Sequence, residues 1–135
     1  WLKTIQQAKD EAVWPVGVSI HPRYLNTQQS FGECVPCQFE QFGIREVTVM
    51  FYTRNLSNIT STLRAAMQKH PDLIFSLAQS LEHELAAESS YAQQPTNIFQ
   101  HSMNTLEKQL NARNFGGIII QSWQDMQGYF YENPL

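Results

Sequence analysis

The segment that most constrains the fold is residues 114–123, in which two glycines precede three consecutive isoleucines and a polar, aromatic group follows. A run that is apolar on both faces and bounded by turn residues is typical of a parallel strand buried on both sides. Gly116 and Gly117 are expected to end the preceding helix with a positive φ and to turn the chain into this strand. Gln121 and Trp123 would then lie at its C-terminal end, where parallel α/β folds carry their chemistry.

Three further segments are candidate strands. Residues 16–20 alternate between apolar and small or polar side chains, and residues 45–52 are rich in β-branched and aromatic ones, which favours strands. Residues 72–78 fit a short buried strand. The alternative for this segment is a helix that continues to residue 85, because four leucines recur every four residues: Leu73, Leu77, Leu81 and Leu85.

Apolar residues recur every three to four positions in residues 1–12, 59–67 and 99–110. This period predicts three amphipathic helices. Short polar side chains at their starts can accept hydrogen bonds from free N–H groups of the first turn. The expected capping residues are Ser57 or Asn58 and Thr96 or Asn97. A short helix can form near residues 36–42, and residues 128–135 form an aromatic tail.

Cys34 and Cys37 form a Cys-x-x-Cys pair with proline at the third position, as in thioredoxin-like redox motifs. Such motifs follow a strand directly and start a helix, whereas the strand predicted here ends near His21, too far upstream. Zinc needs four ligands, which one Cys-x-x-Cys pair cannot supply alone, although His21 with one other residue could complete the set. We therefore predict no metal site and no cofactor, and we expect a local disulfide or two free thiols that are not catalytic.

Two of the predicted strands resemble strands of a known fold. Val49-Met50-Phe51-Tyr52-Thr53-Arg54 is similar to the V-M-x-Y-R strand of bacterial TIM-barrel proteins related to glycoside hydrolases. Phe115-Gly116-Gly117-Ile118-Ile119-Ile120-Gln121-Ser122-Trp123 is similar to the F-x-G-I-A-I-x-x-Y/W strand that ends such barrels. Those barrels often carry histidine where this chain has Gln121. Their seventh strand often ends with a glutamate, a place that Glu82 or Glu84 takes if residues 72–78 form a strand.

Strands that alternate with helices predict an α/β fold with parallel strands and right-handed crossovers, in one domain of residues 1–135. A complete (β/α)8 barrel needs about 250 residues and eight strands. With four candidate strands, the chain looks like the C-terminal half of such a barrel, about four βα units. The alternative is a small open parallel sheet. A half-barrel leaves two open strand edges, so the remaining half would come from the same or another chain.

Parallel strands of one sheet all end on the same side, so the residues that follow them should be neighbours. We expect one ligand site there, formed by His21, Tyr52, Arg54, Glu82, Gln121 and Trp123. Such side chains offer hydrogen bonds to sugar hydroxyls and a flat apolar surface to a sugar ring. Glu82 is the candidate catalytic acid or nucleophile and the other five are candidate ligand-binding residues. The second carboxylate that sugar hydrolysis requires would come from the missing half.

Three functions follow as hypotheses. The resemblance implies a carbohydrate-active, glycoside-hydrolase-like protein that acts on an oligosaccharide or another small polar ligand. The alternatives are a non-catalytic sugar- or partner-binding domain and a thiol-redox protein that uses Cys34 and Cys37. The net charge of −3 and the pI near 5.7 exclude nucleic acid as an expected partner. No apolar run is long enough to span a bilayer. The cellular compartment stays open, with a periplasmic or secreted location among the alternatives.

Overall fold

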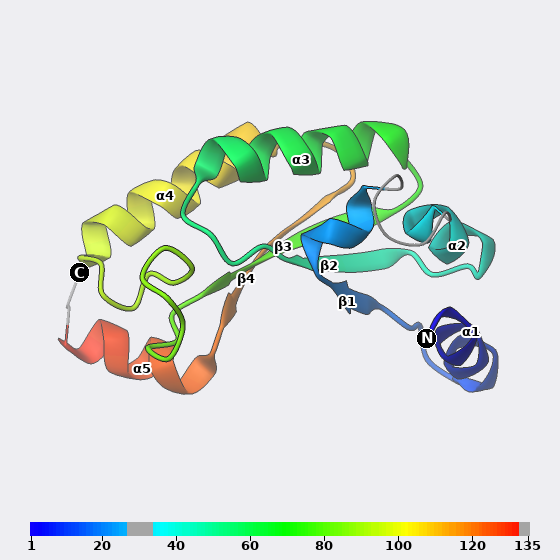
Figure 1. Ribbon diagram of the computed structural model, residues 1–135, viewed down its shortest axis with the longest axis horizontal. Helices are drawn as coiled ribbons and strands as arrows, with labels where there is room; N and C mark the ends of the chain where they lie inside the picture. Colours follow the sequence, from blue (N-terminus) through cyan, green and yellow to red (C-terminus); the bar gives the residue numbers. More distant parts are fainter. Residues whose placement is uncertain (27–33, 133–135) are drawn as a thin grey trace.

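A computed structural model describes residues 1–26 and 34–132. Its centre is a sheet of four parallel strands whose spatial order follows their order in the sequence (Figure 1). The strands are β1 (Val18–Ile20), β2 (Glu46–Met50), β3 (Ile74–Ser80) and β4 (Phe115–Gln121). The predicted α/β fold with parallel strands alternating with helices is therefore confirmed. A sheet of this order is consistent with a half-barrel and with a small open sheet alike.

Helices precede the first strand, connect the strands and follow the last one. They are α1 (Leu2–Glu11), the short 3-10 helix η1 (Pro22–Leu25), α2 (Val35–Gln41), α3 (Leu56–Lys69), α4 (Thr96–Gln109) and α5 (Trp123–Glu132). Helices α3 and α4 lie along the same face of the sheet, and α5 lies near the ends of β3 and β4 (Figure 1). No helix of the described residues is both long and apolar enough to cross a membrane.

The main core lies between the sheet and the helices on that face. Val47 and Val49 of β2 and Phe75 and Leu77 of β3 are fully or almost fully buried. The helix residues in the same cluster include Ile59, Leu63 and Leu106. The period-2 alternation of a strand places these strand residues on the helix-covered face, and their apolar side chains supply the driving force for packing α3 and α4 there.

The opposite face of the sheet is less covered. Thr48 and Ser76 are opposite each other in the register of β2 and β3 and are half-buried, and Ile119 of β4 is 46 % exposed. The prediction that β4 is buried on both sides is wrong. It is an edge strand that pairs with β3 alone, so its alternate side chains have neither a further strand nor a helix layer to cover them.

The double glycine lies inside β4 rather than at the end of the preceding helix. Helix α4 ends at Gln109, and the pairing of β3 with β4 shifts register so that Gly116 has no partner of its own. A Cβ at Gly116 would come within 2.5 Å of Ser76 Oγ and 2.9 Å of Ile74 Cγ2. Gly117 has a φ of +107°, which side-chain-bearing residues rarely adopt. These glycines therefore permit a bulge and a close strand approach. The predicted positive φ is confirmed at Gly117, but the predicted turn at the end of the helix is wrong.

Residues 72–78 contribute to a strand, which decides between the two alternatives. β3 is hydrogen-bonded to β2 on one side and to β4 on the other. Phe75 and Leu77 are buried while Ser76 between them is half-buried, which is the alternation of a strand. The four-residue spacing of leucines misleads because Leu81 belongs to a second apolar cluster beyond the strand.

Three local predictions are corrected. Helix α3 is capped by Asn55, whose side chain accepts a hydrogen bond from Asn58 N at 3.0 Å. Thr96 is the first residue of α4 and follows Pro95, which offers no side-chain cap. The expected aromatic tail is largely the helix α5, in which Tyr129 packs edge-on against Phe99 of α4. Residues 133–135 of that tail lie outside the described residues.

Candidate functional site

Side chains from the ends of three strands meet at the C-terminal edge of the sheet. Tyr52 follows β2, Glu82 follows β3 and Gln121 is the last residue of β4. The Tyr52 hydroxyl donates a hydrogen bond to Gln121 Oε1, and Gln121 Nε2 donates to Glu82 Oε1 at 3.5 Å. We call these three residues the strand-end cluster. The structure thus brings together three of the six predicted site residues, from positions far apart in the sequence.

Ser80 holds the carboxylate of Glu82 in place. The Ser80 hydroxyl donates to Glu82 Oε2 at 2.9 Å and accepts from the Glu82 backbone N–H at 3.0 Å. The Ser80 carbonyl accepts from the Ser90 hydroxyl at 3.1 Å, which fastens the following loop to the strand. One carboxylate oxygen is therefore bound by a neighbouring side chain while the other faces Gln121. Sequence reasoning missed Ser80, although a hydroxyl two residues before a candidate carboxylate is a readable signal.

Gln79 supports the cluster from inside the sheet. Its side chain is buried, and its Nε2 donates to the carbonyl of Phe51 at 2.7 Å. This bond ties the backbone just before Tyr52 to β3. A buried amide bonded to backbone is costly to remove, so Gln79 fixes the relative position of the two strand ends that carry Tyr52 and Glu82.

The environment of Tyr52 keeps its hydroxyl protonated. Burial raises the pKa of Tyr52 above its usual value, and the negative charge of Glu82 raises that pKa further. A phenol already ionises only near pH 10. The Tyr52 hydroxyl is therefore a hydrogen-bond donor throughout the physiological range.

Arg54, a fourth predicted site residue, lies near Tyr91 and is not hydrogen-bonded to the strand-end cluster among the described residues. Its backbone N–H donates to the carbonyl of Glu88 at 2.9 Å, and its buried Nε has no hydrogen-bond partner among the described residues. Burial raises the pKa of Tyr91, while the Ser102 side chain and the charge of Arg54 lower it. The guanidinium of Arg54 is therefore close enough to act on Tyr91, and no hydrogen bond of the described residues joins it to the strand-end cluster.

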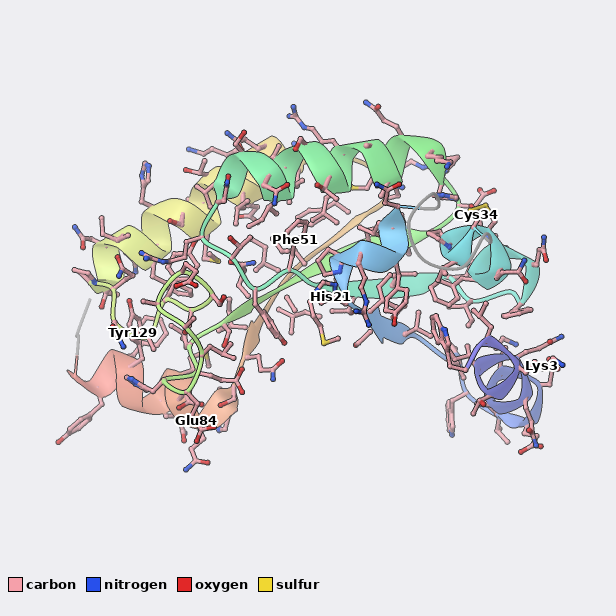
Figure 2. All side chains as sticks on the ribbon, in the orientation of Figure 1. Lys3, His21, Cys34, Phe51, Glu84 and Tyr129 are labelled. Atoms are coloured by element: carbon pink, nitrogen blue, oxygen red, sulfur yellow. A yellow bond between two sulfur atoms is a disulfide. The ribbon has the colours of Figure 1, made fainter. Side chains whose placement is uncertain are left out.

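His21 and Trp123 make no hydrogen bond to the cluster among the described residues. His21 follows β1 (Figure 2), and its Nδ1 accepts from the backbone N–H of Arg23 at 3.1 Å, which caps η1. Trp123 begins α5 and is 67 % exposed. It follows Gln121 by two residues, so its indole is an exposed aromatic surface next to the cluster in sequence. Both residues stand at the predicted strand ends, but the structure assigns His21 a local partner.

A second group of chemically active side chains lies at α2. Cys34 and Cys37 form a disulfide, the outcome expected as a local staple. His70, which follows α3, lies beside this pair, and the candidate ligand atoms of the three residues are all within 4.8 Å of one another. The sequence holds no signal for this neighbour, because more than thirty residues separate His70 from the cysteines.

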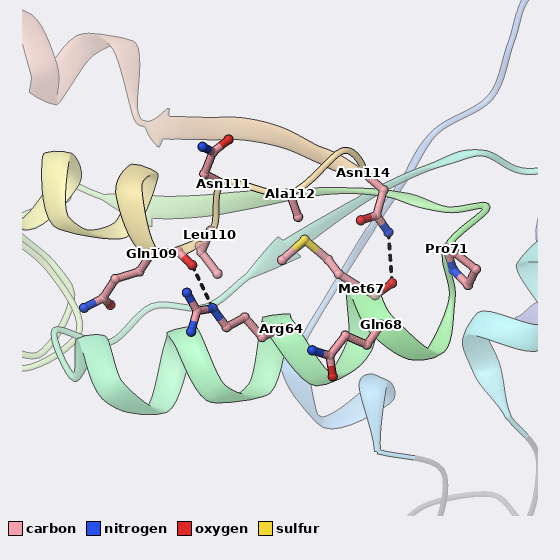
Figure 3. Close-up of a pocket in the computed structure, with 9 residues that line it drawn as sticks. All are labelled: Arg64, Met67, Gln68, Pro71, Gln109, Leu110, Asn111, Ala112 and Asn114. Carbon is pink, nitrogen blue, oxygen red and sulfur yellow. Dashed lines mark hydrogen bonds between the residues drawn. The ribbon is translucent and has the colours of Figure 1, made fainter.

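A cavity of about 340 Å³ lies at the opposite edge of the sheet, between the C-terminal ends of α3 and α4 (Figure 3). Arg64 Nε donates to the carbonyl of Gln109 at 2.8 Å across it. Its lining carries no carboxylate or histidine, so it offers no acid, base or nucleophile. The strand-end cluster, which is open to solvent at Gln121, therefore remains the better candidate for a site.

Comparisons with protein-family models, with curated proteins and with solved structures find no match to this chain.

Proposed function

We propose that this chain is part of a carbohydrate-active, glycoside-hydrolase-like α/β protein that binds its ligand at the C-terminal ends of the strands. The observation that carries the proposal is the hydrogen-bonded contact of Tyr52, Gln121 and Glu82 from three different strand ends. Parallel α/β folds place ligands at this edge. Glu82 is the only carboxylate of the six candidate residues, and sugar hydrolysis generally uses a carboxylate as acid or nucleophile.

The groups of the cluster suit a sugar. A carboxylate accepts hydrogen bonds, a primary amide both donates and accepts, and a protonated phenol does the same. Vicinal sugar hydroxyls need this mixture of donors and acceptors. The exposed indole of Trp123 adds a flat surface of the kind on which the apolar face of a sugar ring packs. A half-buried guanidinium at Arg54 adds a cation that would favour an acidic sugar.

If the chain is half of a barrel, an enzymatic function is favoured over simple binding. In a (β/α)8 barrel the strands are adjacent in sequence order and the helices cover the outer face, and the four strands and α3 and α4 have this arrangement. The less covered face with Ile119 and the free edges of β1 and β4 are then the surfaces that the remaining half completes. That half would also supply the second carboxylate for hydrolysis. The open parallel sheet with a non-catalytic sugar site is the alternative.

Titration of the full chain with a panel of oligosaccharides, followed by calorimetry, tests binding. We expect Tyr52→Phe and Gln121→Ala each to weaken affinity about 3- to 10-fold, the value of one neutral hydrogen bond. The exposed Glu84, in the same loop as Glu82, gives the matched control Glu84→Gln, which should leave affinity unchanged. Absence of binding to every sugar, or equal binding by all four proteins, would overturn the proposal.

A panel of aryl-glycosides separates the enzyme from the binding domain. An enzyme should release the phenol, and Glu82→Gln should lower the rate by about 10²- to 10⁴-fold, as expected for loss of a general acid or base. Binding without hydrolysis in the wild type assigns the non-catalytic alternative. The thiol-redox hypothesis ranks below both, because β1 ends far upstream of Cys34. Insulin-reduction activity that a Cys34→Ser/Cys37→Ser variant loses would reverse this ranking.

A further inference from the structure

The imidazole of His70 is an unusual buried group. His70 is 3 % exposed and follows the last residue of α3. Its Nδ1 lies 3.3 Å from Glu40 Oε2, while its Nε2 is buried without a hydrogen-bond partner among the described residues. Buried polar atoms are nearly always bonded. We therefore expect His70 Nε2 to have a binding partner in another state of the chain than the disulfide form.

Two sulfur atoms lie next to this imidazole. The candidate ligand atoms of Cys34, Cys37 and His70 are all within 4.8 Å of one another. Figure 2 shows Cys34 near the C-terminal end of α3, the helix that His70 follows. Cys34 Sγ also accepts a hydrogen bond from the Cys37 backbone N–H at 3.2 Å. The backbone therefore already positions one sulfur, and both cysteines are half-buried rather than sealed in the core.

We propose that the reduced chain binds one thiophilic divalent cation of the Zn²⁺ class through Cys34 Sγ, Cys37 Sγ and His70 Nε2. A dithiol reductant opens the disulfide by thiol–disulfide exchange: two electrons and two protons pass to the cysteine sulfurs, and the reductant becomes a disulfide. Metal binding then replaces the two thiol protons, which leave to solvent. Two thiolates, one neutral imidazole and one dication form a group without net charge, which suits a half-buried position.

The geometry requires only small movements. Tetrahedral zinc has Zn–S distances of about 2.3 Å and Zn–N distances of about 2.0–2.1 Å, which places its ligand atoms roughly 3.5–3.8 Å apart. Atoms already within 4.8 Å reach this arrangement by side-chain adjustment once the sulfurs are no longer bonded. The described residues supply three ligands, and water can take the fourth position, as in zinc sites that keep an open position.

Glu40 completes the arrangement as a positioning residue. Metal-bound histidines usually donate their other ring N–H to a carboxylate, which fixes the tautomer. A proton on His70 Nδ1 can be donated to Glu40 Oε2, which leaves the lone pair of Nε2 free for a metal. Among the described residues, His70 and not His21 lies with the two cysteines.

The test is titration of the full chain with Co²⁺, followed by addition of Zn²⁺ to the cobalt-bound chain. Both steps are carried out with the cysteines reduced and again with the cysteines oxidised. We expect one Co²⁺ per reduced chain, with a sulfur-to-cobalt charge-transfer band that Zn²⁺ abolishes, and no band from the disulfide form. His70→Ala should weaken affinity more than about 100-fold and Glu40→Ala about 10- to 100-fold, since loss of a ligand exceeds loss of an outer-shell partner. The exposed His101 gives the control His101→Ala, which should not change affinity.

Two results would overturn the proposal. One is a reduced wild type that binds no more Co²⁺ than the Cys34→Ser/Cys37→Ser variant, and the other is equal affinity in wild type and His70→Ala. If His70→Ala does not fold by circular dichroism, ¹¹³Cd NMR of the reduced wild type decides instead. A scalar coupling between bound ¹¹³Cd and His70 Nε2 supports the site, and bound cadmium without that coupling removes His70 from it.

Discussion

Replacement of Asn114 by alanine should destabilise the fold more than is usual for a residue that is only half-buried. Asn114 Nδ2 lies 3.1 Å from the carbonyl of Met67, 3.3 Å from that of His70 and 3.1 Å from that of Leu73. The Met67 carbonyl, seen in Figure 3, cannot have its usual helical partner four residues on, because Pro71 has no N–H. Asn114 therefore joins the end of α3 and the start of β3 to the segment before β4.

The magnitude follows from the donors available. An amide NH₂ has two hydrogens, so the three contacts amount to about two hydrogen bonds, each with a net value of about 1 kcal/mol. An orphaned buried carbonyl costs about 1–3 kcal/mol, but the cavity of about 340 Å³ beside Asn114 admits water, which keeps this cost at its lower end. We expect Asn114→Ala to lower the free energy of unfolding by about 2–3 kcal/mol.

Urea unfolding followed by circular dichroism, with linear extrapolation to water, measures this loss. The exposed Asn111 lies in the same loop, and Asn111→Ala is the matched control with an expected change below about 0.5 kcal/mol. Asn114→Asp should be at least as harmful as alanine, because it sets an acceptor against three carbonyl oxygens. A loss in Asn114→Ala no larger than in the control would refute the reasoning.

Three other predictions concern the fold. Gly116→Ala should cost about 1–3 kcal/mol in urea unfolding, because its Cβ would overlap neighbouring atoms of β3, whereas Gly128→Ala, with open space around it, should not destabilise. Asn55→Ala should cost about 1 kcal/mol as a lost helix cap, and equal loss in Ser57→Ala would contradict that assignment. Burial raises the pKa of Tyr91, so the protonated form favours the folded state. The contribution of Tyr91 to the free energy of unfolding should stay constant below about pH 10 and fall as the pH rises through the pKa of Tyr91 in the folded chain. Tyrosinate absorbance should show this ionisation at a higher pH than for a free tyrosine.

The sequence predicted the framework because its signals are local. Strand alternation and helix periods located β2 and α3 to within a few residues, and the alternation of elements predicted the parallel sheet. The leucine spacing around residue 77 was ambiguous. Leucines four residues apart fit one face of a helix, and they also fit a strand that is followed by a loop. What decided it was pairing with β2 and β4, and pairing is a non-local property.

The candidate site was also predicted only in part. Strand ends must be neighbours, and this rule brought Tyr52, Glu82 and Gln121 together. It cannot fix where a side chain points beyond the last strand residue, so it did not foresee that His21 caps its own turn. Nor can local patterns find a contact such as that of His70 with the cysteine pair, because these residues are far apart in the sequence and meet only in the folded chain.

The central claim is that the strand-end cluster binds a sugar, and side-chain NMR of the full chain tests it most directly. The signal of the Gln121 side-chain amide should shift saturably on titration with a binding oligosaccharide, together with the Tyr52 ring signals. The Gln109 amide, beside the cavity at the opposite edge of the sheet, should not move. A bound oligosaccharide that shifts Gln109 and leaves Gln121 and Tyr52 unchanged would contradict the account.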